Sequence, residues 1–207
     1  VLTGAEVLKV VFEDRRSTGV LLRDASGERV VTARREVILS AGAIASPVLL
    51  QHSGIGDGKL LQILGIPVLV DAPEVGRNLQ EHFNYKSVYL AAKGSLNAEF
   101  AGLRLAGNML RYLLLRSGPM TRSVWELGGF VKTRPGLTRP DAQLGIGLYS
   151  VSGGGVDSFP GVTISGYTVN PKSRGYLRIV SPDPGTKPFI DANFLGDPED
   201  QKAAVAL

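Results

Sequence analysis

The sequence predicts a mixed fold of α+β and α/β class, and three observations lead to this prediction. Residues 5–40 alternate apolar and polar side chains between turn-forming residues, as the strands of an antiparallel meander do. A strand-like run at 36–40 then meets a small-residue turn and a helical segment at about 46–52, which is the order of elements in α/β proteins. After His82 the pattern is typical of an antiparallel sheet with one long helix against it.

The composition is that of a folded protein and limits the chemistry. The chain has 207 residues, of which 43% are hydrophobic and 20% are charged, so a disordered chain is excluded. No apolar run reaches the roughly 18 residues that span a bilayer. Cysteine is absent, which excludes disulfides, thiolate metal sites and a cysteine nucleophile. The net charge of +4 is spread singly along the chain, so we expect no nucleic-acid partner.

The first half of the chain is expected to contain short elements. Turn residues at 13–17 and 24–27 separate the strands of the meander. A short helix is predicted over 59–64, with Gly65 as its C-cap and a strand over 66–70 behind it. A turn over 73–76 follows.

The second half is expected to be mostly strands. The long helix is predicted over 98–116, where Leu and Met residues recur at helical spacing, as in ordinary core packing. The final residues, 198–207, also have a helical pattern. The predicted strands are 85–91, 125–132, 142–149, 162–169 and 176–180.

The most informative segment is residues 42–56, at the expected strand-to-helix corner. Gly42 would let the backbone approach a ligand closely, Ser46 is a candidate N-cap, and Pro47 suits the first helical position. Such a corner could receive a polar or anionic cofactor. The alternative is an ordinary corner, because many α/β proteins place Gly and Ser-Pro there.

Two further groups of residues are candidates for chemistry. His82 follows Glu81, so a carboxylate could orient its imidazole for proton transfer, although such a pair is often only a partly exposed, satisfied contact. Glu126 stands between Trp125 and Phe130 and could receive a cation, or it could simply face solvent from a strand. The sequence lacks GxSxG, GxxxxGK[ST], HExxH and EF-hand motifs.

Taken together, these segments resemble the glucose-methanol-choline (GMC) family of flavoprotein oxidoreductases. Residues 42–56 resemble the second signature of that family, with Ser-Pro, paired leucines and Ser-Gly-Ile-Gly in order. One residue departs from the pattern, because the family commonly has Asp where this chain has Glu81. Later segments are similar to choline-dehydrogenase-like and alcohol-dehydrogenase-like members. The supporting segments are 36–42, 64–68, 75–82, 94–97, 118–120, 126–130, 140–143, 171–175, 181–184 and 188–194.

The resemblance implies a domain organisation. Residues 1–82 would be the rear part of an FAD-binding Rossmann-like domain, 83–170 a substrate-binding domain, and 171–207 the start of the C-terminal conserved region. Members of the family also carry a GxGxxG unit and a catalytic histidine, which this sequence lacks. We therefore expect an internal fragment of a larger flavoenzyme, with the catalytic histidine downstream of Leu207.

The resemblance also implies a function and a set of site residues. FAD would accept a hydride from the CH–OH group of a small-molecule alcohol, with an unknown final electron acceptor, no metal, and a cytoplasmic location. The alternative is a non-catalytic α+β domain that binds a small ligand or a partner. The cofactor contacts implied are Val7, Ser40, Ala41, Gly42, Asn78 and Leu79, and the substrate contacts are Trp125, Glu126 and Phe130.

Overall fold

The computed structural model describes all residues from 1 to 207, and contacts within the chain divide them into two units. Unit 1 consists of Val1–Glu81 and Ser173–Phe194, and unit 2 of His82–Lys172 and Leu195–Leu207. The segment expected to open a C-terminal region, 171–207, therefore contributes to both units. The functional assignment of the three expected domains stays a prediction.

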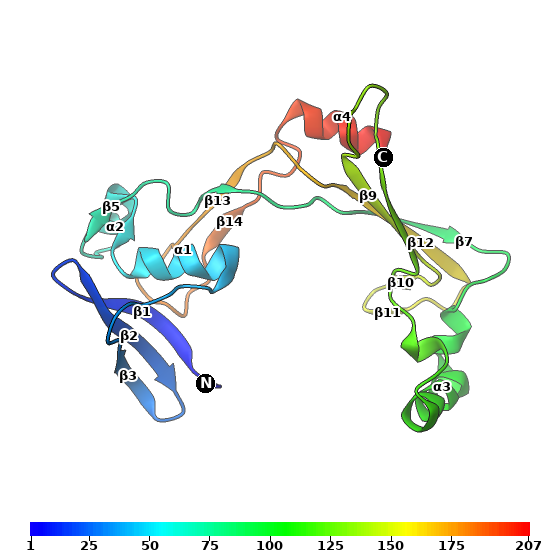
Figure 1. The fold of residues 1–207 in the computed structure, drawn as a ribbon, viewed down its shortest axis with the longest axis horizontal. Helices are drawn as coiled ribbons and strands as arrows, with labels where there is room; N and C mark the ends of the chain where they lie inside the picture. Colours follow the sequence, from blue (N-terminus) through cyan, green and yellow to red (C-terminus); the bar gives the residue numbers. More distant parts are fainter. The chain divides into compact units, whose positions relative to one another are not determined.

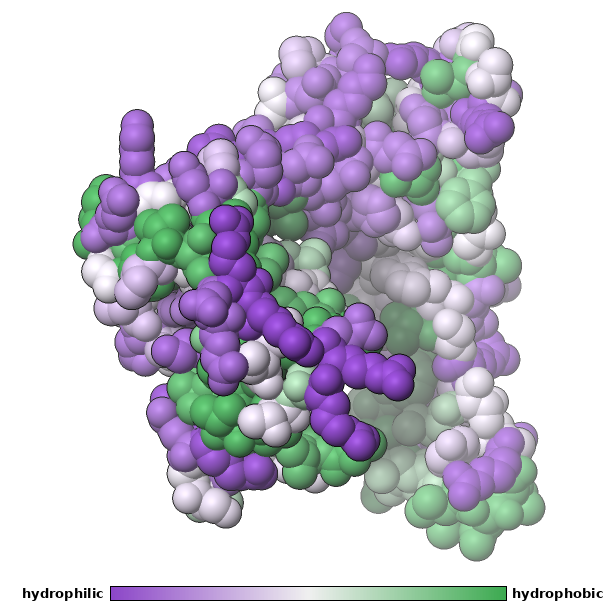
Figure 2. Space-filling view, turned by 60° about the vertical axis from the view of Figure 1, so that its left-hand side comes forward, coloured by the Kyte–Doolittle hydropathy of each residue, from purple (hydrophilic) through white to green (hydrophobic).

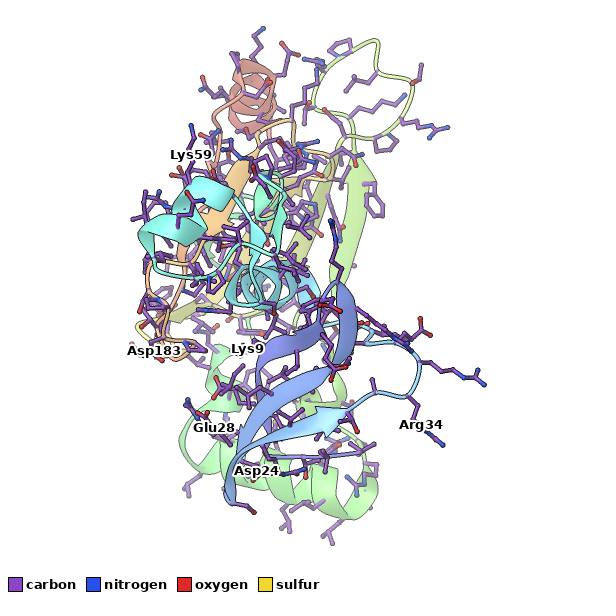
Figure 3. The ribbon with its side chains drawn as sticks, turned by 90° about the vertical axis from the view of Figure 1, so that its left-hand side faces the viewer. Lys9, Asp24, Glu28, Arg34, Lys59 and Asp183 are labelled. Atoms are coloured by element: carbon purple, nitrogen blue, oxygen red, sulfur yellow. The ribbon has the colours of Figure 1, made fainter.

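Unit 1 begins with the predicted antiparallel meander, in the strand order β1-β2-β3. Ion pairs hold the β2–β3 hairpin: Arg29 with Asp24 at 2.9 Å, and Arg23 with Glu28 at 3.0 Å (Figure 3). Helix α1 packs on β1 (Figure 1). The elements of unit 1 are β1 Glu6–Glu13, β2 Arg16–Asp24, β3 Gly27–Thr32, α1 Gly42–His52, β4 Ile55–Gly56, α2 Gly58–Ile63, β5 Val70–Asp71, β6 Arg77–Leu79, β13 Gly175–Arg178 and β14 Phe189–Asp191.

Helix α1 starts four residues earlier than its sequence predicts. Ser46 is not the N-cap; its hydroxyl lies inside the helix and accepts a hydrogen bond from the Ala41 N–H at 3.0 Å. Pro47 is likewise internal, which leaves the Ala43 carbonyl without its helical partner. Ala43 is exposed, so water can satisfy that carbonyl.

Two predicted strands of unit 1 are wrong in whole or in part. Residues 36–40 are not a strand, because no neighbouring strand pairs with them, and Ile38 is 76% exposed. Of residues 66–70 only Val70 is in a strand, the short β5, which pairs with β4 in parallel. Apolar β-branched residues favour extended backbone, but a strand also needs a hydrogen-bonding partner.

Gln51 connects α1 to two other segments of unit 1. Its side chain is 1% exposed, its Oε1 accepts from the Ile179 N–H at 2.8 Å, and its Nε2 donates to the Val75 carbonyl at 3.2 Å. The sheet β14-β13-β6 thereby stays attached to α1. A buried polar side chain with both ends bonded fixes a single arrangement of the segments it joins.

The exposed surface of unit 1 carries many apolar side chains. Figure 2 shows hydrophobic patches among hydrophilic side chains on the face turned forward. Exposed apolar residues of this unit include Val30, Ile38, Ile44 and Ile63. Such exposure in patches, rather than singly, is typical of surfaces that meet another surface.

Unit 2 contains a four-stranded antiparallel sheet in the order β7-β12-β9-β8, which confirms the predicted type of sheet. The glycines at 153 and 154 form the turn of the small β10–β11 hairpin, both with positive φ. Helix α4 packs on β12. The elements of unit 2 are β7 Tyr85–Leu90, η1 Asn97–Phe100, α3 Gly102–Leu115, η2 Pro119–Thr121, β8 Leu127–Val131, β9 Ala142–Gly147, β10 Val151–Ser152, β11 Gly155–Val156, β12 Gly161–Thr168 and α4 Pro198–Ala206.

The long helix of unit 2 differs from its prediction in two ways. It is interrupted at Ala101, whose φ of −132° and ψ of 152° are extended, so a 3₁₀ turn precedes α3. The predicted core packing is also wrong, because none of the α3 residues is buried. Leu103, Leu110 and Leu114 are 93%, 58% and 72% exposed. Helical spacing predicts an apolar face but does not say what covers it.

No helix of the chain has both the length and the apolar character needed to cross a bilayer.

Candidate functional site

Three of the six predicted cofactor residues meet in one groove of unit 1. This groove, which we call the unit 1 groove, has a volume of about 670 Å³ and is mostly apolar. Val7 of β1 lines it together with Ser40 and Ala41 of the segment before α1. The lining residues are Glu6, Val7, Leu8, Val20, Val37, Ile38, Leu39, Ser40, Ala41, Ala45, Val48, Leu49, His52 and Pro184.

Val7 reaches the unit 1 groove because it lies on an irregular edge strand. β1 pairs only with β2, so its other edge is not covered by a strand of this sheet. The register shifts between Val7 and Lys9, which marks a β-bulge at the groove. Bulges re-aim backbone and side-chain groups and are common beside binding sites.

Gly42 directly follows the lining segment 37–41, but it is not itself among the residues that line the groove. Its φ is +86°, a conformation that L side chains rarely adopt, and a Cβ built on it meets no atom within 4 Å. The glycine is therefore required by the backbone, and the space next to it is open. The predicted close approach of a ligand at this position is compatible with that space.

His52 is a polar group in the unit 1 groove with no partner for one of its nitrogens. The residue is 8% exposed, and its buried Nε2 has no hydrogen bond. Burial lowers the pKa of His52 below its ordinary value of 6.5, while the Asp183 carboxylate, on the loop after β13, opposes that shift (Figure 3). Burial therefore favours the neutral form of the imidazole, in which one nitrogen donates and the other accepts.

Like Gly42, the predicted cofactor residues Asn78 and Leu79 do not line the unit 1 groove. Both belong to β6, where Leu79 pairs with Gly175 of β13. Asn78 has a φ of +61°, which asparagine tolerates better than most residues. Their role as cofactor contacts stays a prediction.

A second hollow lies within unit 2, and we call it the unit 2 pocket. It has a volume of about 420 Å³, within the range of small-molecule sites. Glu126, a predicted substrate contact, lines it together with Arg122, whose Nη1 lies 3.1 Å from the Glu126 Oε2. The lining residues are Leu96, Phe100, Leu105, Pro119, Met120, Arg122, Ser123, Val124, Glu126, Tyr149 and Val156.

The other two predicted substrate residues face elsewhere. Trp125 lines a separate hollow of about 150 Å³, and its ring covers Gly145, whose Cβ would lie 3.2 Å from the indole. Trp125 and Glu126 thus line different hollows, but both precede β8, so the strand predicted over 125–132 begins only at Leu127 and strand alternation is not the reason. Phe130 is 63% exposed and lines neither hollow.

His82 belongs to unit 2, and two contacts fix the position of its side chain. Its ring stacks on Tyr167 with 4.4 Å between ring centroids, and its Nε2 lies 3.1 Å from the Val169 carbonyl oxygen. These contacts describe a positioned histidine, and neither hollow includes it.

Sequence reasoning missed three residues, of which Arg122 and Tyr149 line the unit 2 pocket and Gln51 joins segments of unit 1. Gln51 is a polar residue that interrupts an apolar helical run. A polar residue at such a buried position indicates a buried hydrogen bond. Arg122 stands four residues before Glu126, a spacing that could have suggested an ion pair. Tyr149 gives no local signal; it follows β9, packs edge to face on Phe100, and burial raises its pKa.

Comparisons with known proteins agree with this architecture. Residues 1–84 match the family model described as GMC oxidoreductase. An uncharacterized GMC-type oxidoreductase of Mycobacterium tuberculosis is 40% identical over 205 residues, which are 95% of this chain and 37% of that protein. An alcohol dehydrogenase [acceptor] of Pseudomonas putida is 36% identical over 215 residues, covering 100% of this chain and 38% of that protein. An oxygen-dependent choline dehydrogenase of Rhizobium etli is 36% identical over 196 residues, covering 93% of this chain and 36% of that protein.

A solved structure extends the likeness to the fold. Formate oxidase of Aspergillus oryzae superposes with a TM-score of 0.85 at 26% identity, over 98% of this chain and 41% of that one. All of these relatives are oxidoreductases by name. The chain belongs to the GMC oxidoreductase family. It spans between 36% and 38% of the length of the curated relatives it matches.

Proposed function

We propose that residues 1–207 form part of an FAD-dependent oxidoreductase that oxidises the CH–OH group of an alcohol. The observation that carries the proposal is the meeting of Val7, Ser40 and Ala41 in the unit 1 groove. These are the positions at which the family resemblance implies contacts with the dinucleotide. Two relatives are named as alcohol and choline dehydrogenases, which supports an alcohol as the substrate.

The residues of the unit 1 groove fit the adenosine end of FAD. The walls offer apolar side chains such as Val20 and Val48 to a flat base. The edge of β1 that no strand of its sheet covers offers backbone hydrogen-bonding groups at the same place.

In the proposed enzyme, FAD supplies the hydride acceptor when it is bound. The part played by this chain is binding and positioning. Val7, Ser40 and Ala41 would hold the dinucleotide in the unit 1 groove, with Gly42 next to them in the chain, and the unit 2 pocket would hold the body of the alcohol and exclude water from it. We assign proton abstraction to neither His52 nor His82, because His52 and its Nε2 are buried in unit 1 and His82 lines neither hollow.

The proposal is tested by comparing FAD retention in two matched glycine variants. Gly42→Ala and Gly65→Ala introduce the same methyl group where φ is positive, +86° and +71°, and where no atom lies within 4 Å. Both variants therefore have the same kind of backbone cost. Gly65 ends α2 away from the unit 1 groove, so only Gly42→Ala should lose FAD affinity. Crowding costs of about 1–3 kcal/mol correspond to roughly 5- to 150-fold weaker binding.

Flavin content after gel filtration and a fluorescence titration with FAD give the affinities. Equal affinities in the two variants would remove Gly42 from the cofactor site. A full-length protein that binds no FAD at all would favour the other function that the sequence left open, a non-catalytic binding domain.

A further inference from the structure

The charges of the unit 2 pocket come from a single ion pair. Arg122 and Glu126 are the charged residues among those that line it, and the remaining walls are largely apolar. Arg122 Nη1 lies 3.1 Å from Oε2 and 3.4 Å from Oε1 of Glu126. The formal charges of the lining therefore cancel.

The backbone on both sides of this pair is fixed. The Arg122 N–H donates to the Pro119 carbonyl at 3.2 Å, and the Glu126 N–H donates to the Ile146 carbonyl at 3.1 Å. Arg122 is thereby tied to the end of η2, and Glu126 to β9. The Glu126 side chain is 20% exposed and the Arg122 side chain 51%, so the carboxylate is the more enclosed partner.

A pocket that selects a cationic alcohol needs an unpaired negative charge or open aromatic faces. Here the carboxylate already has a cation, and a second cation would be repelled by Arg122. The aromatic wall consists of Phe100 and Tyr149, which pack edge to face at 5.6 Å and 67°. Such a wall, with Leu105 and Met120 beside it, suits an uncharged hydrocarbon body.

We infer that the Arg122–Glu126 ion pair restricts the unit 2 pocket to uncharged alcohols with an apolar body and excludes quaternary ammonium alcohols. This inference rests on the proposed function and specifies its substrate class. Arg122 is a specificity-determining residue in it, because it compensates the carboxylate that would otherwise attract a cation.

The test uses two alcohols of the same shape and different charge. One is choline, and the other is its uncharged isostere, in which a quaternary carbon replaces the ammonium nitrogen. The FAD-loaded enzyme is assayed with both by following flavin reduction. The wild-type protein should give a kcat/KM at least about tenfold higher for the uncharged alcohol. A tenfold ratio requires only a small difference in electrostatic free energy between the two alcohols in the pocket.

Two variants distinguish the effect of breaking the Arg122–Glu126 ion pair from the general effect of losing an arginine. Arg122→Gln leaves the Glu126 carboxylate uncompensated and should shift the preference toward choline by about tenfold or more. Arg104→Gln breaks another Arg–Glu pair of unit 2, with Glu99 at 3.2 Å, outside the pocket. That control should keep the wild-type preference.

A second readout does not depend on turnover. The chain contains two methionines, of which Met120 lines the unit 2 pocket and Met109 lies on α3 outside it. In protein with methyl-labelled methionine, the uncharged alcohol should shift the Met120 methyl resonance and leave that of Met109 in place. Choline should shift the Met120 resonance only in Arg122→Gln.

The outcomes of these experiments distinguish a failure of the ion-pair inference from a failure of the proposed function. A wild-type preference for choline, in turnover or in the Met120 shift, overturns the inference while flavin reduction still supports the proposed function. The same preference in wild type and Arg122→Gln also overturns it. Failure of a panel of alcohols to reduce bound flavin refutes the proposed function, whereas the Met120 shifts still report which charge the pocket accepts.

Discussion

Replacing Gln51 by methionine removes one buried and one partly buried hydrogen bond and roughly keeps the volume of the side chain. In the native protein the Gln51 Oε1 accepts from the Ile179 N–H at 2.8 Å, and its Nε2 donates to the Val75 carbonyl at 3.2 Å. Both Gln51 and Ile179 are 1% exposed, so water cannot replace the first bond. Val75 is half-buried, so its carbonyl can regain water.

The cost of Gln51→Met follows from these two environments. An unsatisfied buried N–H at Ile179 costs about 1–3 kcal/mol, and the bond lost at Val75 costs about 0.5–1.5 kcal/mol. The free energy of unfolding should therefore fall by about 2–4 kcal/mol. With a urea m-value of about 1–3 kcal/mol/M, the unfolding midpoint should fall by roughly 1 M or more.

Urea unfolding of the wild-type protein and two variants checks this value. Gln62→Met on α2 is the matched control, because Gln62 is exposed and should change stability by less than about 0.5 kcal/mol. Hydrogen exchange at the Ile179 amide should accelerate in Gln51→Met alone. If both variants unfold at the wild-type urea concentration, then the buried bonds do not hold α1 to the β14-β13-β6 sheet.

Three other predictions concern separate parts of the chain. Asn97→Leu should lower the thermal stability of unit 2 by about 2–4 kcal/mol, because the buried amide bonds the Ser150 backbone on both sides, and an unchanged Tm would contradict this. The lowered pKa of His52 means that the unfolded state binds a proton more readily, so stability should fall as the pH drops below about 6.5. His52→Gln should flatten that part of the urea-midpoint profile, and an identical slope would refute the assignment. Leu110→Glu with Leu114→Glu on α3 should reduce binding of a hydrophobic dye with little loss of helix, since both side chains are exposed.

The parts of the fold that depend on local chemistry could be predicted from the sequence. The meander follows from turn residues and alternation, and Gly65 ends α2 with a φ of +71°, as a C-cap glycine does. The strand at 36–40 failed because its apolar pattern does not specify a partner. The α1 boundary failed because Ser46 bonds backwards to Ala41 from within the helix.

The candidate site was predicted only in part, for a different reason. Val7 is 33 residues away from Ser40 in the chain, and only the resemblance to a family suggested that both contact one ligand. The ion pair of Arg122 and the bonds of Gln51 depend on distances between elements, which no single-sequence pattern reports. The core packing predicted for α3 was wrong, because the spacing of its apolar residues shows which face is apolar but not whether another element covers that face.

The irregular edge of β1 also affects how copies of this protein meet. A regular, unpaired edge would act as a template for a strand of another molecule and promote aggregation. In β1 the register shifts twice, and the Val10 N–H is already engaged by the Ser53 hydroxyl at 2.8 Å. An incoming strand therefore finds neither an even ladder nor a free donor at Val10, so the irregularity that opens the groove also discourages self-assembly through this edge.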